Sequence, residues 1–200
     1  MSSGPSPRKR VLLVASSGNL LGGAEHCLVD VVSGMQGSDW EPIVAVPSEG
    51  TLAAALRRLG AIVWVVDLGV LRHRGEAKSP ILALRMATAV AASRKLTKMI
   101  RQHDVRIVHS NAATVVAGAL AARSARVPHV WHVRELLGGP AWKLLRRAMY
   151  AGSARIVCIS DTVARHVTDG RASAVVTVIH DGIDLTLFHP AEHAEPGADV

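Results

Sequence analysis

The sequence predicts an α/β fold, a doubly wound and mainly parallel sheet with helices on both faces. Short apolar segments rich in branched residues alternate with longer segments whose apolar residues recur at helical spacing. The first apolar segment, residues 11–15 (VLLVA), contains no polar residue, as expected for a central strand buried on both faces. A glycine-rich loop follows at 16–23, and a helix begins at Ala24, an order that commonly opens such domains.

The remaining elements continue this alternation. Further strands are expected at 41–46, 62–66, 107–109, 129–133, 155–159 and 175–179, and further helices at 51–59, 80–102, 114–125, 141–150 and 161–167. Pro47 ends the second strand, and Gly60 suits the position after the second helix. Pro80 occupies the first turn of the third helix, and Ser160 is the expected N-cap of the last one. The helix at 114–125 is rich in small residues, so it can pack closely on the sheet.

Composition and length indicate one folded domain. Residues 1–10 are expected to be a disordered tail, 11–182 a Rossmann-like domain, and 183–200 an interdomain linker and tail. The two cysteines, Cys27 and Cys158, are not expected to form a disulfide framework, which favours a reducing, cytoplasmic compartment. The formal net charge of +7 suggests an anionic partner, although a basic surface can also serve solubility alone.

The glycine loop is the first candidate for ligand binding. Gly22 and Gly23 directly precede a helix, where free backbone N–H groups and the positive end of the helix dipole favour a phosphate. The loop has neither the G-x-G-x-x-G dinucleotide fingerprint nor the Gly-Lys-Ser/Thr of a P-loop. A Rossmann dehydrogenase is therefore poorly supported, and many loops of this kind bind nothing.

Three features are expected to converge at the carboxyl edge of the sheet. Gly22 and Gly23 follow the first strand, Ser110 and Asn111 follow the fourth, and His132 lies near the end of the fifth. Ligands of open α/β sheets bind at this edge, near the point where the strand order reverses. The sequence therefore predicts a site there.

Several segments together resemble the N-terminal domain of the GT-B glycosyltransferases of the retaining family 4. They are GGAE at 22–25, DVRIVHSN at 104–111, VPHVWHVRE at 127–135, IVCIS at 156–160, VIHDGID at 178–184 and FHP at 188–190. Each is weak alone, and their order and spacing carry the match. The resemblance implies transfer of a sugar from a nucleotide sugar to an acceptor with retention of configuration. It implies no metal and no cofactor beyond the sugar donor.

The same resemblance implies a division of labour between two domains. In the family the N-terminal domain mostly holds the acceptor, and the C-terminal domain binds the sugar nucleotide through paired glutamates. Neither that domain nor its glutamates are found in these 200 residues. We therefore expect this chain to be the acceptor-side half of an enzyme and to be inactive by itself.

Site residues are carried over where the motifs match. Gly22 and Gly23 resemble the loop that approaches the donor diphosphate, and His132 resembles the catalytic histidine beside the transferred sugar. The acceptor-side candidates are Ser110, Asn111, Arg134 and Glu135. Two simpler interpretations stay open: His132 can be a hydrogen-bonded strand-end histidine, and Arg134 and Glu135 can pair with nearby opposite charges.

The nature of the partner stays open at this stage. The acceptor can be a glycan, a lipid-linked molecule or a small molecule, and the scaffold also suits a sugar-nucleotide epimerase. A non-catalytic module that binds an anionic lipid or glycan is a third possibility. Nucleic-acid binding is not expected, because no recognition motif accompanies the positive charge.

A contact with the inner membrane face is suggested by the segment 140–150. Its apolar stripe consists of Trp142, Leu145 and Met149, flanked by Lys143, Arg146 and Arg147. A basic amphipathic helix of this kind can attach reversibly to an anionic surface. The alternative is that the stripe packs on the sheet and the cations face solvent.

Overall fold

One parallel sheet of seven strands organises the described residues. The computed structural model describes residues 8–71, 80–183 and 185. The strands are β1 (Lys9–Val14), β2 (Trp40–Val46), β3 (Ile62–Val65), β4 (Val105–Ser110), β5 (His129–Val133), β6 (Arg155–Cys158) and β7 (Val176–Val178). Their order is β3-β2-β1-β4-β5-β6-β7, and each neighbouring pair is parallel. The order reverses between β1 and β4, which is the topological switch point.

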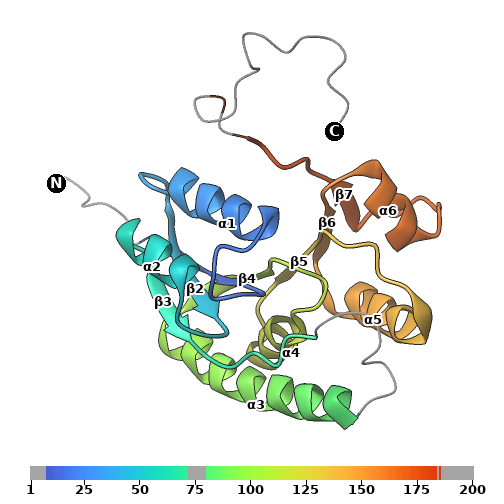
Figure 1. Ribbon diagram of the computed structural model, residues 1–200, viewed down its shortest axis with the longest axis horizontal. Coiled ribbons are helices and arrows are strands. Elements are labelled where there is room, and N and C mark those ends of the chain that lie inside the picture. The colour runs from blue at the N-terminus through green and yellow to red at the C-terminus, as the bar shows by residue number, and fades with distance from the viewer. Residues whose placement is uncertain (1–7, 72–79, 184, 186–200) are drawn as a thin grey trace, which may run out of the picture.

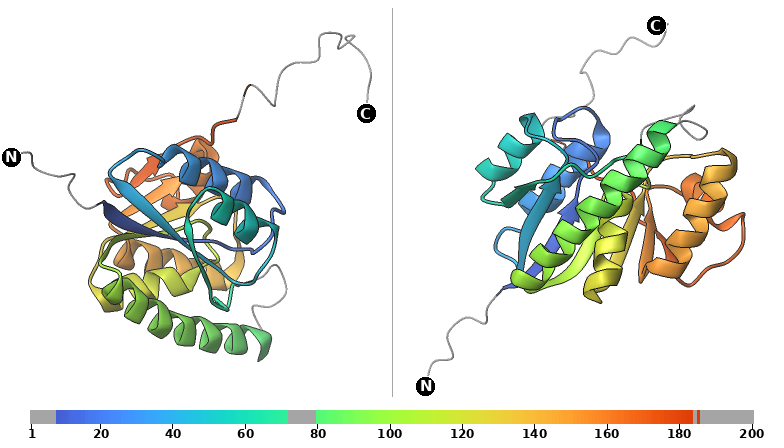
Figure 2. Two further views of the ribbon diagram at one scale, coloured as in Figure 1. Left: turned by 90° about the vertical axis from the view of Figure 1, so that its left-hand side faces the viewer. Right: turned by 90° about the horizontal axis from the view of Figure 1, so that it is seen from below.

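Helices cover both faces of this sheet, as expected for a Rossmann-like fold. They are α1 (Gly23–Gly34), α2 (Thr51–Arg58), α3 (Pro80–Gln102), α4 (Val116–Ala125), α5 (Gly139–Gly152) and α6 (Asp161–Thr168). Figures 1 and 2 show α1 and α2 on one face and α3, α4 and α5 on the other. Helix α6 packs beside β6 and β7 in the same core as α5. The predicted fold class is therefore confirmed, with every predicted strand and helix in its place.

The central strand is buried on both faces, as its sequence predicts. Val11 and Leu13 pack under α1 and α2, whereas Leu12 and Val14 pack against α3 and α4. None of these four side chains is more than 5% exposed. Each contributes on the order of 1.5–3 kcal/mol to folding through burial.

The boundaries differ from the predictions mainly at the first strand. β1 begins at Lys9, so Lys9 and Arg10 belong to the sheet rather than to the expected tail at 1–10. The Arg10 guanidinium donates to the Glu41 carboxylate on β2 at 2.6 Å and to the backbone carbonyl of His103 at 3.1 Å. These contacts extend the strand beyond its apolar residues. Residues 1–7, 184 and 186–200 of the expected tails and linker lie outside the described residues.

Two loops at the carboxyl edge interlock and hold α2. Its N-cap, Gly50, has no capping side chain, and the acceptors come from the loop after β1 instead. The Asn19 Oδ1 accepts from the Thr51 N–H at 3.1 Å, and the Gly18 carbonyl accepts from the Leu52 N–H at 3.0 Å. A Cβ on Gly18 would lie 2.1 Å from the Ser48 carbonyl oxygen. Glycine is therefore required there for close approach.

Helix α4 approaches the sheet closely through a glycine, as its small residues predict. A Cβ on Gly118 would lie 2.6 Å from the Ser110 Oγ and 3.1 Å from a methyl group of Val14. Any larger residue at position 118 would push α4 away from β1 and β4.

The apolar stripe of α5 packs on the sheet, which is the second of the two alternatives that the sequence left open, so the stripe is not available to insert into a membrane. Trp142 and Met149 are buried, and Leu145 packs against the same core, which contains Ile156 and Val163. The Trp142 ring also stacks on His166 of α6. A helix on a sheet must bury one face, and here the apolar residues form that face.

Within the described ranges, no helix combines the length and apolarity needed to cross a membrane.

Candidate functional site

The start of α1 is tied to β4 across the switch point. Asn111 follows β4, its backbone N–H donates to the Val14 carbonyl at 2.9 Å, and its side-chain amide donates to the Ala24 carbonyl at 2.9 Å. Ala24 lies in the first turn of α1, directly after the exposed Gly22 and Gly23. The structure thus brings Asn111 and the glycine loop together, as the sequence predicts.

An acidic residue occupies the same helix end. The Glu25 side chain is buried and accepts a hydrogen bond from the Ser16 hydroxyl at 3.0 Å. A Cβ on Gly22 would lie 3.7 Å from the Glu25 Oε2, whereas one on Gly23 would meet no atom within 4 Å. A ligand can therefore reach the backbone at Gly23 freely, and Glu25 stabilises the first turn through the helix dipole.

A second group of side chains gathers around the end of β5. The Arg134 guanidinium donates to the Asp181 carboxylate through Nη1. Its Nη2 lies 3.4 Å from the His132 Nδ1 and 3.4 Å from the Asn111 Oδ1. The Arg134 side chain is only 7% exposed, although it carries a full charge. His132, Arg134 and Asn111, predicted from three separate motif positions, therefore belong to one cluster.

His132 is held neutral in this cluster. Burial and, to a smaller extent, the positive charge of Arg134 lower the pKa of its imidazole to about 4, against the opposing effect of Asp181. Its Nε2 atom is buried and has no hydrogen-bond partner among the described residues. The His109 ring, from β4, meets the His132 ring edge-on at 5.5 Å. Buried side-chain nitrogens without a partner are rare in folded proteins, and a ligand atom is one group that can supply the missing partner.

Two of the predicted residues have other contacts. The Ser110 hydroxyl is fully buried on the opposite face of the sheet and lies 3.0 Å from the His129 Nε2. The Glu135 carboxylate accepts from the backbone N–H groups of Ala113 and Arg134, both at 3.1 Å. Glu135 thus joins the loops after β4 and β5, whereas the Arg134 side chain pairs with the opposite charge of Asp181.

Three residues of the cluster were missed by the sequence-based prediction. Asp181 follows β7, so it lies at the same carboxyl edge of the sheet as the other site residues. Its position after a predicted strand could have indicated this from the sequence. His109 lies on the same sheet face as His132, as strand alternation requires. The Cys27 thiol lies beside the Arg134–Asp181 pair; burial and then the Asp181 charge raise its pKa, whereas Arg134 opposes the rise. No sequence pattern indicated that contact.

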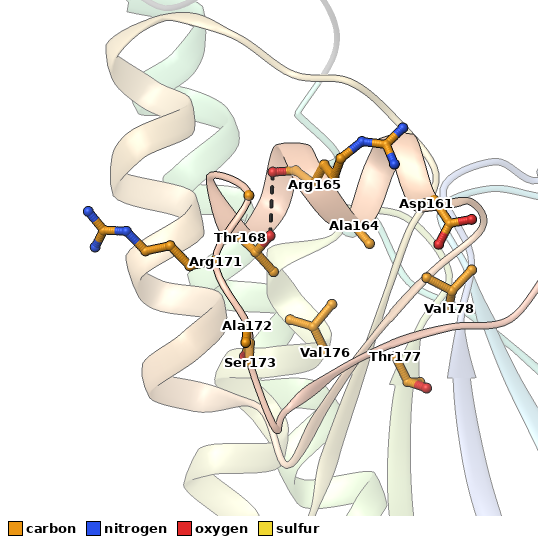
Figure 3. Close-up of a pocket in the computed structure, with 11 residues that line it drawn as sticks. Asp161, Ala164, Arg165, Thr168, Arg171, Ala172, Ser173, Val176, Thr177 and Val178 are labelled. Atoms are coloured by element: carbon orange, nitrogen blue, oxygen red, sulfur yellow. Dashed lines mark hydrogen bonds between the residues drawn. The ribbon is translucent and has the colours of Figure 1, made fainter.

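A separate hollow of about 300 Å³ lies between α6 and β7 (Figure 3). Ala164, Thr168 and Val176 contribute to its lining, and the guanidinium groups of Arg165 and Arg171 extend away from it. It contains none of the predicted site residues.

In the part of the chain that the structure describes, no group of three or more His, Cys, Asp or Glu side chains is placed to hold a metal ion.

The match to a known protein family agrees with the observed fold. Residues 21–187 match the family model described as Glycosyltransferase Family 4. No curated protein matches the chain.

Solved structures share the fold at low sequence identity. HepE from Anabaena, in complex with UDP and glucose, is 19% identical with a TM-score of 0.67; the match covers 92% of this chain and 48% of HepE. A glycosyltransferase from Rickettsia africae ESF-5 is 19% identical with a TM-score of 0.67, covering 96% of this chain and 47% of that one. A UDP-N-acetylglucosamine 2-epimerase is 14% identical with a TM-score of 0.56, covering 86% and 48%.

The chain spans about half the length of these solved structures. The likenesses show the fold, which is that of GT-B glycosyltransferases. The family match covers most of the sequence. The chain therefore belongs to glycosyltransferase family 4.

Proposed function

We propose that this chain takes part in transferring a sugar from a nucleotide sugar to an acceptor, with retention of configuration, and that it forms the acceptor-side half of the catalytic site. The observation that carries this proposal is the buried, unpaired Nε2 of His132 at the carboxyl edge of the sheet. It belongs to the cluster that contains Asn111, which in turn holds the first turn of α1. Family membership and the UDP and glucose in the HepE structure support the same reaction.

The proposed roles follow from the chemistry of each group. His132 contacts the transferred sugar as the catalytic residue. Gly22 and Gly23 let the diphosphate approach the backbone and the positive end of α1. No protein nucleophile is proposed: the acceptor oxygen bonds to the anomeric carbon as the bond from that carbon to the diphosphate breaks. The leaving diphosphate, rather than a protein base, takes up the acceptor proton. Catalysis then rests on orientation and on charge stabilisation of the diphosphate.

The acceptor is proposed to bind near Asn111 and Arg134, between the ends of β4 and β5. Its class stays open: a glycan, a lipid-linked molecule or a small molecule would each fit the proposal. We also propose a cytoplasmic location and reaction without a metal ion or other cofactor.

A transfer assay with the complete gene product that contains this chain tests the proposal. UDP release from UDP-glucose and UDP-N-acetylglucosamine is measured with and without candidate glycan acceptors. We expect His132→Ala to lower the transfer rate by about a hundredfold or more, within the range for loss of a group that acts on the reacting atoms. His103→Ala is the matched control, because His103 precedes β4 at the opposite edge of the sheet.

The outcomes separate the alternatives. Transfer that is unchanged in His132→Ala would contradict the role of His132. Isomerised donor without transfer would indicate an epimerase, a possibility favoured by the structural likeness to one. We expect the 200-residue chain alone to release no UDP above a protein-free control, and turnover by it would contradict the assignment of donor binding to a second domain.

A further inference from the structure

The position of the proton on His132 can be deduced from its neighbour. A guanidinium group has only donors, and a neutral imidazole has one donor and one acceptor nitrogen. The Nη2 of Arg134 lies 3.4 Å from the His132 Nδ1. That nitrogen must therefore accept, and the proton of the neutral ring resides on Nε2.

The surroundings favour this neutral form. The charged and titratable side chains that face the His132 ring are Arg134 directly after β5, Asp181 after β7 and His109 on β4. Burial and Arg134 keep the pKa of His132 near 4, so the ring is uncharged at neutral pH. A neutral ring next to a fixed cation has one stable arrangement of its proton.

Arg134 is itself fixed from three directions. Its Nη1 donates to Asp181, and its Nη2 is shared between the Asn111 Oδ1 and the His132 Nδ1. A cation that is only 7% exposed needs a nearby counter-charge, which Asp181 supplies. Residues that follow β4, β5 and β7 thus together orient one guanidinium group against one ring nitrogen.

We propose that Asp181 and Arg134 are positioning residues that present His132 as a fixed hydrogen-bond donor at Nε2. The atom that His132 binds is then an acceptor oxygen, either of a sugar hydroxyl or of a phosphate group. Because Nδ1 is occupied and Nε2 already carries the proton, His132 does not act as a general base. The identity of the ligand rests on the proposed function; the placement of the proton does not.

Long-range ¹H–¹⁵N correlation spectra of the ¹⁵N-labelled chain test the proton placement without any substrate. In the wild-type chain near neutral pH, we expect the His132 proton on Nε2. The charge swap Arg134→Glu with Asp181→Arg keeps an ion pair but places an acceptor at Nδ1. We expect the proton to move to Nδ1 and the pKa of His132 to rise, because the neighbouring charge is reversed.

The matched control is the swap Arg57→Glu with Glu49→Arg. That pair is exposed, and its wild-type contact is 2.7 Å between Nη1 and Oε2. We expect it to leave the His132 spectrum unchanged. A wild-type proton on Nδ1, or a His132 proton that stays on Nε2 in the folded charge swap, would overturn the proposal. If the charge swap does not fold, Arg134→Lys decides: it keeps a donor, so a shift of the proton to Nδ1 would equally overturn it.

An activity measurement then separates this inference from the proposed function. In the complete gene product, Asp181→Asn should lower kcat by about ten- to a hundredfold, the loss of one charge-assisted hydrogen bond, with a smaller change in KM. An unchanged kcat in an active enzyme would contradict the positioning role. A wild-type enzyme without transferase activity but with the expected proton placement would contradict the proposed function alone.

Discussion

The side-chain amide of Asn111 donates to the backbone carbonyl of Ala24 at 2.9 Å, joining two residues that are 87 positions apart. The bond crosses the switch point, where β1 and β4 lie side by side and their loops diverge. It therefore fixes the start of α1, and with it the glycine loop, relative to the end of β4.

Replacing Asn111 with alanine should destabilise the protein and loosen the first turn of α1. The amide bond to the half-buried Ala24 carbonyl and the longer contact with Arg134 are both lost, which corresponds to about 1–2 kcal/mol in the free energy of unfolding. Chemical denaturation measures this loss. Hydrogen exchange should show faster exchange at Glu25 and His26, whose N–H groups bond the Gly22 carbonyl. Unchanged exchange there would contradict the tie between Asn111 and α1.

Gly18→Ala should destabilise the protein by about 2 kcal/mol or more, because the new methyl group would collide with the Ser48 backbone carbonyl. Gly34→Ala is the matched control. A Cβ at Gly34, in the last turn of α1, meets no atom within 4 Å and should stabilise the helix by about 0.5–1 kcal/mol. Thermal unfolding measures the stability of both variants. Equal changes in stability for Gly18→Ala and Gly34→Ala would contradict the close contact between the two loops.

Acid should weaken the fold through buried histidines. His129 lies between the hydroxyl groups of Ser110 and Ser153, and burial lowers its pKa from 6.5 to about 4. The unfolded chain therefore binds a proton that the folded chain excludes as the pH falls from 6.5 towards 4. The contribution of His129 to the free energy of unfolding is therefore fully present above pH 6.5. It falls by about 3 kcal/mol as the pH drops from 6.5 to about 4.

Urea midpoints across this pH range measure the effect. His109 and His132 contribute with the same sign, because burial also lowers their pKa values, to about 3 and about 4. We expect His129→Gln to flatten the pH dependence, and His26→Gln, at an exposed position of α1, to leave it as in the wild type. A slope in His129→Gln equal to that of the wild type would contradict the assignment.

Binding of α5 to an anionic membrane surface should be mainly electrostatic. The apolar stripe of α5 is buried, and Arg146 pairs with Asp169, which leaves Lys143 and Arg147 exposed on this helix. Each cation contributes about 1 kcal/mol at an anionic surface, so we expect weak, salt-sensitive binding to anionic vesicles and none to neutral ones.

Co-sedimentation with vesicles measures this binding. The reversal Lys143→Glu with Arg147→Glu should abolish it, whereas Arg57→Glu with Arg58→Glu, on the opposite face of the sheet, should retain it. Equal loss in both variants would show a response to net charge rather than a docking face.

The elements of the fold were predictable because the strands and helices have clear periodicities. Val11 to Val14 are apolar on both faces, which only a central strand requires, and the helices begin and end at residues such as Pro80 and Ser160. The start of β1 was not predictable from hydrophobicity. Lys9 and Arg10 are charged, and Arg10 is held in the sheet by a partner on β2 that is distant in sequence.

The site residues were predictable where the alternation of side chains along a strand places them on the correct face of the sheet. Asn111 and His132 fall into the cluster because both lie at the ends of neighbouring strands. Ser110 does not, since it precedes Asn111 by one residue and its side chain points into the opposite core, beneath Gly118. The ion pair between Arg134 and Asp181 depends on a contact across the sheet, which local sequence does not encode.

The first N–H groups of α2 are capped by the loop after β1, and this contact has a consequence for the order of folding. An eight-residue helix whose N-cap is a glycine has little tendency to form alone. Its first N–H groups find acceptors only when the loop at Gly18 and Asn19 has reached its native position. We therefore expect α2 to be absent from the folding nucleus and to appear after β1 and β2 have paired. Substitutions on its exposed side should speed unfolding while leaving the refolding rate nearly unchanged.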